Sequence, residues 1–150
     1  MKESVNILVV DDEHSILAVL EQYISREGYN VGTAAGGKEA LDYLARERVD
    51  LMICDIVMPD MSGYDLLAAA KKDHPDMGVI MMTGFNDGRA VRQALLLGAD
   101  EYITKPLKGD ELSLIIERIC WKLRPKWLEA ERSGSRPVTA AAGIDPFLGR

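Results

Sequence analysis

Polar side chains that could do chemistry follow four short apolar runs of this sequence. They are three carboxylates, a hydroxyl and an ammonium: Asp11, Asp12, Asp55, Thr83 and Lys105. If the apolar runs are neighbouring parallel strands, their carboxyl ends lie along one edge of a sheet, where open α/β proteins bind ligands. We therefore expect these side chains to share one site.

The three carboxylates predict a cation site. Asp11 and Asp12, beside a third carboxylate from another strand, repel one another unless a cation compensates their charge. Mg²⁺ suits this role because it prefers hard oxygen ligands, usually one or two carboxylates completed by waters and phosphate oxygens. Asp11, Asp55 and the backbone carbonyl of Val57 are the expected ligands, with Asp12 holding a bound water. Taken alone, Asp12 could instead be a helix cap.

Asp55 is the expected nucleophile. It follows an apolar run and precedes the turn-rich segment 56–63, so we expect its carboxylate to be exposed at the sheet edge. Carboxylates of this kind form aspartyl phosphates. That reaction needs neutralisation of the phosphoryl oxygens and in-line approach rather than a strong base.

The hydroxyl of Thr83 and the ammonium of Lys105 could each contact a phosphoryl oxygen. Gly84, which has no side chain, would leave access to Thr83. Viewed singly, Thr83 could be a plain β-branched strand end and Lys105 a surface lysine. Pro106 makes a cis peptide bond after Lys105 plausible, and Tyr102 could be a core aromatic residue with its hydroxyl at the surface.

Strand and helix patterns alternate along the chain. The expected strands are Ile7–Val10, Tyr29–Ala34, Leu51–Cys54, Val79–Met82 and Tyr102–Ile103. The expected helices run from Ile16 to a stop at Gly28, and over Lys38–Arg48, Gly63–Lys72, Asp87–Leu97 and Asp110–Arg124. Such alternation favours a parallel sheet with helices on both faces, so we expect a five-stranded, doubly wound α/β domain.

Length and charge limit the remaining choices. A chain of 150 residues fits one domain over residues 1–124, with residues 125–150 forming a brief helix extension and a flexible linker. The net charge of −6 gives no basic surface for direct nucleic acid binding. The N-terminal apolar run is too short for a signal peptide or a membrane span. Cys54 and Cys120 are expected to be buried free thiols, which favours a cytoplasmic location.

Residues 1 to about 124 resemble the receiver domain of two-component response regulators. The resemblance rests on motifs in the expected order along the chain: Ile7–Glu13, Asp55–Gly63, Thr83–Gly84, Gly98–Tyr102 and Lys105–Leu107. It implies a flavodoxin-like fold with strand order 2-1-3-4-5. It also implies a signalling domain that catalyses only its own phosphorylation and dephosphorylation.

The same resemblance implies a role for each site residue. Asp55 takes a phosphoryl group from a sensor histidine kinase or a phosphotransfer protein, with Mg²⁺ at Asp11, Asp12, Asp55 and the Val57 carbonyl. Lys105 and Thr83 contact the phosphoryl group. Phosphorylation draws Thr83 inward, Tyr102 turns into the vacated space, and the surface near the fourth helix and fifth strand changes. A homodimer through the fourth and fifth helices is compatible with this change.

Val57 and Phe85 place apolar side chains where other receivers often carry polar ones. We hypothesise that these two side chains shield the acyl phosphate from water and slow its hydrolysis.

Residues Gly143–Arg150 are faintly similar to the entry of an AAA+ ATPase domain in nitrogen-regulator-type transcription activators. On that reading the chain is a regulatory fragment that controls transcription through a further domain, and Trp121–Arg132 helps to pair receivers. The alternative is a stand-alone receiver that acts through protein–protein contacts and has a disordered tail.

Two enzyme classes fit less well. Phosphohydrolases of the haloacid dehalogenase family carry an Asp-x-Asp pair after their first strand, a spacing that Asp11-Asp12-Glu13-His14 lacks. No glycine-rich loop follows the first apolar run, which disfavours a nucleotide- or flavin-binding module.

Overall fold

Five strands and five helices alternate in the computed structural model, which describes residues 2–84 and 88–135. The strands are β1 (Asn6–Val10), β2 (Asn30–Ala34), β3 (Leu51–Asp55), β4 (Gly78–Thr83) and β5 (Glu101–Thr104). The helices are α1 (His14–Arg26), α2 (Gly37–Arg46), α3 (Gly63–Asp73), α4 (Gly88–Leu96) and α5 (Gly109–Ser133), and a short 3₁₀ helix (Lys2–Ser4) precedes β1.

All strand pairs are parallel, and the strand order is β2-β1-β3-β4-β5. This confirms the predicted doubly wound sheet and its order. In the register, Val10 lies opposite Cys54 and Asp55 lies opposite Met82. The carboxyl ends of the strands therefore meet at one edge, and the expected place for a ligand crevice lies between β1 and β3, where the strand order reverses.

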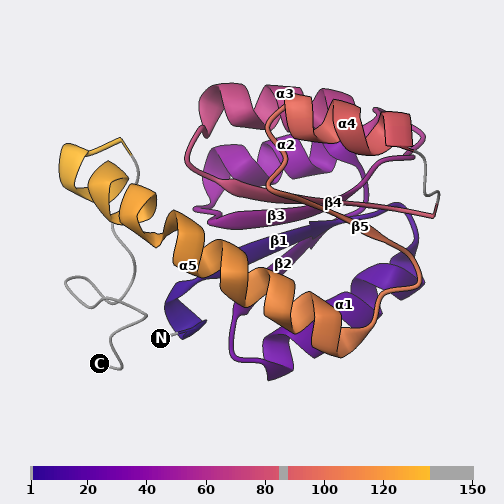
Figure 1. Cartoon of the computed structure of the whole chain (residues 1–150), viewed down its shortest axis with the longest axis horizontal. Helices are drawn as coiled ribbons and strands as arrows, with labels where there is room; N and C mark the ends of the chain where they lie inside the picture. Colours follow the sequence, from indigo (N-terminus) through magenta and orange to yellow (C-terminus); the bar gives the residue numbers. More distant parts are fainter. Residues whose placement is uncertain (1, 85–87, 136–150) are drawn as a thin grey trace.

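The sheet is buried on both faces because helices cover each of them. Helices α2, α3 and α4 lie on one face, and α1 and α5 lie on the other (Figure 1). Within β1, Leu8 and Val10 belong to the core on the first face, whereas Ile7 and Val9 belong to the core on the second. Burial on both faces explains why the central strands β1, β3 and β4 are largely apolar runs in the sequence, whereas the edge strands β2 and β5 are only partly buried.

The last helix runs without a break through the predicted helix Asp110–Arg124 and the expected extension after Pro125. Helix α5 continues through Pro125 to Ser133, where Gly134 ends it with a φ of 77°. A proline inside a helix costs about 3 kcal/mol because it removes one hydrogen bond and crowds the preceding turn. Burial of Trp127 and Ala130 against the domain offsets that cost.

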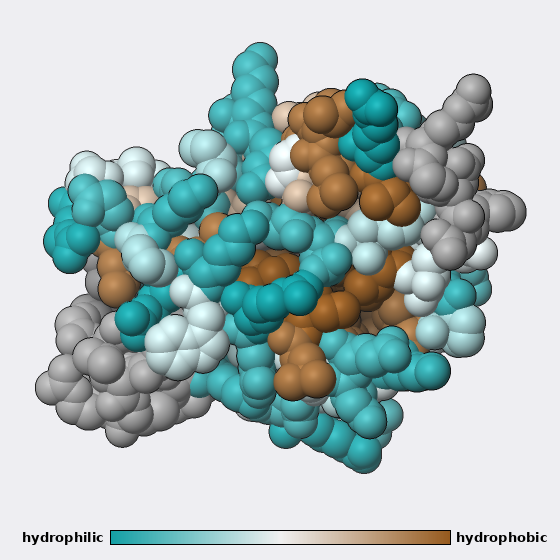
Figure 2. Space-filling model, viewed as in Figure 1, coloured by the Kyte–Doolittle hydropathy of each residue, from teal (hydrophilic) through white to brown (hydrophobic). Residues whose placement is uncertain are grey.

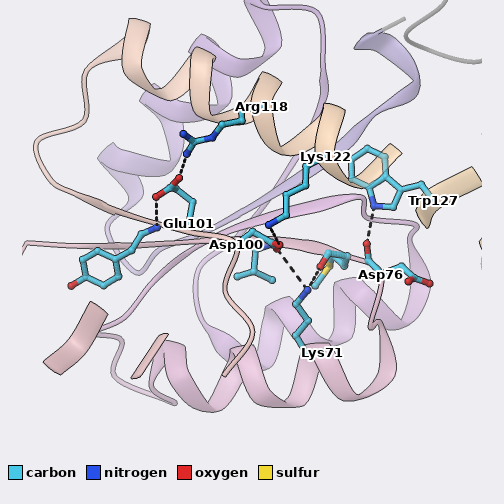
Figure 3. A network of polar contacts seen from close by, with 10 residues as sticks. Lys71, Asp76, Asp100, Glu101, Arg118, Lys122 and Trp127 are labelled. Atoms are coloured by element: carbon cyan, nitrogen blue, oxygen red, sulfur yellow. Dashed lines mark hydrogen bonds and ion pairs between the residues drawn. The ribbon is translucent and has the colours of Figure 1, made fainter. Parts of the chain in front are cut away.

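Polar contacts fasten α5 to the domain along its length. Figure 3 shows Arg118 paired with Glu101, Lys122 with Asp100, and the Trp127 ring bonded to the loop before β4. The Nε1–H of Trp127 donates to the carbonyl of Asp76 at 2.8 Å. Nearer the helix end, Arg48 joins Glu131 to Asp50, with ion-pair distances of 2.9 Å to each. Residues 125–135 thus pack on the domain, while residues 136–150, including the expected linker, lie outside the described residues.

Two further sequence expectations concern the cysteines and the membrane. Cys54 and Cys120 are both free and buried, as predicted. Within residues 2–84 and 88–135, no helix is long and apolar enough to cross a membrane.

Candidate functional site

The carboxylates predicted to form a site lie close together. Asp11 and Asp12 directly follow β1, and Asp55 ends β3, the strand beside it. Each contributes an oxygen to a group in which all ligand atoms lie within 4.8 Å of one another. Asp11 and Asp55 are buried, whereas Asp12 is exposed, so the group opens to solvent on the Asp12 side.

Lys105 reaches this acidic group from β5. Its Nζ lies 2.8 Å from Asp11 and 3.5 Å from Asp55, and 3.8 Å from Glu13. Its N–H donates to the Thr83 carbonyl at 2.7 Å, and the Lys105–Pro106 peptide bond is cis. The Lys105 side chain is partly buried and paired with these carboxylates, so it is not a plain surface lysine.

The burial of Asp55 differs from the sequence expectation. Its carboxylate was expected to be exposed, yet the residue is only 5% exposed, because the β3–α3 loop and the neighbouring strand ends enclose it. Burial and the nearby charge of Asp11 raise its pKa, and this rise is partly countered by Lys105 and by the backbone N–H of Val57. Burial lowers the pKa of Lys105, but its hydrogen bond to Asp11 and the carboxylates around it raise the pKa overall.

The β3–α3 loop, which follows Asp55, brings its two ends close together. The Gly63 N–H donates to the Ile56 carbonyl at 2.7 Å, and a Cβ at Gly63 would lie only 2.3 Å from the Asp55 carbonyl oxygen. A glycine is therefore required where α3 begins. Ser62 caps that helix by accepting from the Asp65 N–H. Val57, the second residue of the loop, is 61% exposed, and the role of its carbonyl as a metal ligand stays a prediction.

Thr83 lies on β4, the strand beside β3, and Tyr102 lies on β5, the edge strand beyond it. Thr83 ends β4 and is 2% exposed, and Tyr102 is a partly buried residue of β5 that packs against the core beneath α2, α3 and α4. Both positions are compatible with a conformational change that passes from the acidic group to α4 and α5. The roles of Thr83 and Tyr102 as switch residues stay predictions. Phe85, expected to flank the site, lies outside the described residues.

Two residues near the site were not singled out from the sequence. Glu13 adds a third carboxylate around Lys105, beside Asp11 and Asp55, and its N–H donates to Asp11 at 2.9 Å. Asp60, in the β3–α3 loop, accepts hydrogen bonds from the first turn of α2. Glu13 could have been noticed because it follows the Asp11-Asp12 pair, but no sequence signal links Asp60 to a helix that begins 23 residues earlier.

The acidic group is chemically suited to a hard divalent cation. Three carboxylates supply oxygen donors within 4.8 Å of one another, and burial and the charge of Asp11 both raise the pKa of Asp55. A bound Mg²⁺ would relieve this repulsion. Asp11, Asp12 and Asp55 therefore fit the cation that the sequence suggested.

Comparisons with known proteins agree with this geometry. The family model described as the response regulator receiver domain matches residues 7–117. The response regulator SaeR of Staphylococcus aureus is 36% identical over 119 residues, which are 79% of this chain and 52% of SaeR. This chain thus spans about half the length of the curated relatives it matches.

Solved structures show the same fold. A CheY-like receiver domain protein from Methanospirillum hungatei JF-1 has a TM-score of 0.74 and 38% identity, covering 83% of this chain and 98% of that one. The chemotaxis protein CheY4 of Vibrio cholerae has a TM-score of 0.74 and 28% identity, covering 76% of this chain and 97% of that one. From its fold, its acidic group and these relatives, this chain belongs to the response regulator receiver domain family.

Proposed function

We propose that this receiver domain accepts a phosphoryl group on Asp55 from a sensor histidine kinase or a phosphotransfer protein. The observation that carries the proposal is the position of Lys105, whose Nζ lies 2.8 Å from Asp11 and 3.5 Å from Asp55 at the edge of a three-carboxylate group. One cation beside three carboxylates leaves negative charge uncompensated, which suits a divalent metal. The metal and Lys105 together would then balance the negative charge of an incoming phosphoryl group.

The metal site would be formed by Asp11, Asp12, Asp55 and the Val57 carbonyl. When bound, Mg²⁺ supplies the positive charge that neutralises the phosphoryl oxygens. Lys105 adds a second positive charge beside Asp11 and Asp55, and Thr83 offers a hydroxyl on the strand adjacent to β3.

The transfer itself needs few groups. A carboxylate oxygen of Asp55 attacks the phosphorus of a phosphohistidine, the new O–P bond forms as the P–N bond breaks, and the imidazole nitrogen keeps the electron pair. Because Asp55 attacks as a carboxylate, it needs no base to remove a proton. Lys105 stays protonated throughout, since the surrounding carboxylates raise its pKa.

The output would use the surface of α4, β5 and α5. Figure 2 shows hydrophobic residues on α4 and in the hollow between α4 and α5. That hollow has a volume of about 410 Å³ and includes Tyr102, Leu95 and Ile115 in its lining. Movement of Tyr102 would change its shape, and an exposed apolar surface of this kind suits a protein partner or a second copy of the chain.

We further propose that the chain regulates transcription through another domain from a cytoplasmic location, by analogy with its response regulator relatives. The expectation that Trp121–Arg132 pairs receivers has less support, because Trp127 and Ala130 are buried against their own domain. A stand-alone receiver that acts through the α4–α5 hollow is the second candidate.

Phosphorylation from a small acyl phosphate in the presence of Mg²⁺ tests the proposal. Intact-mass spectrometry should detect one phosphoryl group on the wild-type chain and none on Asp55→Asn, whereas the exposed control Asp73→Asn should behave as wild type. Lys105→Ala should lower the rate without abolishing Mg²⁺ binding. Repeated turnover of organic phosphates would favour a phosphohydrolase instead, and an adduct that persists in Asp55→Asn would refute the proposal.

A further inference from the structure

The side chain of Asp60 joins the β3–α3 loop to the start of α2. Its Oδ1 accepts from the Gly37 N–H at 3.1 Å, and its Oδ2 accepts from the Lys38 N–H at 2.9 Å. Amide groups at a helix start have no partner within the helix, and the residue before α2 is Gly36, which has no side chain to accept them. Asp60 therefore caps α2 from a different part of the chain.

Two glycines make room for this contact. A Cβ at Gly36 would lie 2.9 Å from Oδ1 of Asp60, and a Cβ at Gly37 would lie 2.7 Å from Cγ of Met61. The start of α2 and the loop are thus in close contact over two successive residues on each side. Larger side chains on the α2 side would push the loop away.

The loop fastened in this way borders the acidic group. It begins at Asp55, and Pro59 and Asp60 line a hollow of about 400 Å³ together with Asp12. At its base the loop is closed by the bond between Gly63 and Ile56. Val57 is the second residue of the loop, three positions before Asp60. The bonds of Asp60 to α2 thus fix the part of the loop that faces Asp12, directly after the segment that carries Val57.

We propose that Asp60 is a positioning residue for metal binding, which holds the β3–α3 loop where the Val57 carbonyl can join the carboxylates around the cation. This inference rests on the proposed function, since it presupposes Mg²⁺ at the acidic group. Asp60 is suited to the task because a carboxylate at a helix start is favoured by the helix dipole and by charge-assisted hydrogen bonds. The amides of Lys38 and Gly37 accordingly lower the pKa of Asp60, so it stays ionised at neutral pH.

Loss of this contact should weaken Mg²⁺ binding. If the loop occupies its binding position for only a fraction of the time, the apparent Mg²⁺ affinity equals the affinity of the correctly placed loop multiplied by that fraction. Residues that hold metal ligands in place typically contribute at least about tenfold to affinity. We expect Asp60→Ala to raise the Mg²⁺ dissociation constant about tenfold, with Asp60→Asn between Asp60→Ala and wild type.

Titration calorimetry of the full chain with MgCl₂ measures this effect, with Glu39→Gln as the matched control. Glu39 also accepts a hydrogen bond at the start of α2, from the Ala35 N–H at 2.9 Å, but it belongs to α2 itself rather than to the loop. Glu39→Gln should change the dissociation constant by less than about twofold. At saturating Mg²⁺, the phosphorylation rate of Asp60→Ala should approach that of wild type, because the phosphoacceptor and Lys105 are unchanged.

A second measurement needs no metal. Hydrogen exchange at the Gly37 and Lys38 amides should be faster in Asp60→Ala than in Glu39→Gln. Gly36→Ala should displace the Asp60 carboxylate and weaken Mg²⁺ binding in the wild-type background, but it should have no further effect in Asp60→Ala.

The outcomes separate the two proposals. If the folded wild-type chain binds no Mg²⁺, the proposed function fails. If wild type binds Mg²⁺ and Asp60→Ala binds it equally well, the positioning role alone is overturned. Equal weakening by Asp60→Ala and Glu39→Gln would also overturn it, since the loss would then reflect general damage to α2.

Discussion

Trp127 is the residue that most directly shows whether the extension of α5 belongs to the folded domain. It follows Pro125 by two positions, is only 4% exposed, and donates a hydrogen bond to the Asp76 carbonyl. We predict that Trp127→Ala strongly destabilises the domain, although the family match itself ends at residue 117.

The magnitude follows from burial and from the lost hydrogen bond. Replacing a buried tryptophan by alanine costs about 3 to 5 kcal/mol, and one hydrogen bond contributes about 1 kcal/mol. Because Trp127 lies near a helix end that can relax, we expect a loss near the lower limit, about 3 kcal/mol. Trp127→Phe keeps much of the apolar contact, so it should cost about 1 to 2 kcal/mol.

Urea unfolding followed by circular dichroism measures these free energies. Trp121 provides a matched control, since it is a tryptophan of the same helix but is 55% exposed. The Arg124 guanidinium lies 4.8 Å from its ring centroid, a contact worth about 0.5 to 1 kcal/mol, so Trp121→Ala should cost no more than that. Equal losses of under about 1 kcal/mol for Trp121→Ala and Trp127→Ala would show that the extension does not stabilise the domain.

Three further predictions concern the site and its surroundings. Burial raises the pKa of Cys54, and it raises the pKa of Cys120 to about 12. Neither thiol should therefore react with an alkylating reagent at neutral pH until the chain is unfolded. Labelling of either cysteine in the folded chain would contradict this prediction. Burial and the charge of Asp11 raise the pKa of Asp55 in the folded chain above its ordinary value of 3.8. The folded chain therefore holds a proton on Asp55 more tightly than the unfolded chain does, and the free energy of unfolding falls as the pH rises from 3.8 through the raised pKa. Without divalent cations, Asp55→Asn should therefore raise the melting temperature at neutral pH, with a smaller gain at acidic pH, and a lower melting temperature at neutral pH would refute the explanation. Val57→Asn combined with Phe85→Glu should shorten the half-life of the phosphorylated chain, measured by intact-mass spectrometry over time, whereas an unchanged or longer half-life would rule out shielding.

The sheet could be predicted from the sequence because its central strands, β1, β3 and β4, are buried on both faces. Runs such as Leu51–Cys54 carry no polar residue until the strand ends, so the sequence marks both the strand and its carboxyl end. Since parallel strands end at the same edge, the approach of Asp11, Asp55 and Lys105 followed from topology alone.

Features that depend on tertiary contacts could not be predicted in the same way. Pro125 is a helix-ending signal, and only the packing of Trp127 and Ala130 explains why α5 continues past it. The capping of α2 by Asp60 is equally hidden, because the contact joins residues far apart in the chain.

The burial of Asp55 was missed for a related reason. A carboxylate before a turn-rich loop is expected to be exposed. Here the close approach of Gly63 to the Asp55 backbone folds that loop tightly over the strand end. The sequence shows the glycine but not the contact that requires it.

The location of the phosphoryl group on the chain is the most direct test of the central claim. The chain would be phosphorylated in the presence of Mg²⁺, the acyl phosphate reduced with borohydride to convert the modified aspartate to homoserine, and the peptides sequenced by tandem mass spectrometry. The account predicts that residue 55 alone is converted. Conversion at Asp11 or Asp12, or at no aspartate despite a phosphoryl adduct, would contradict it.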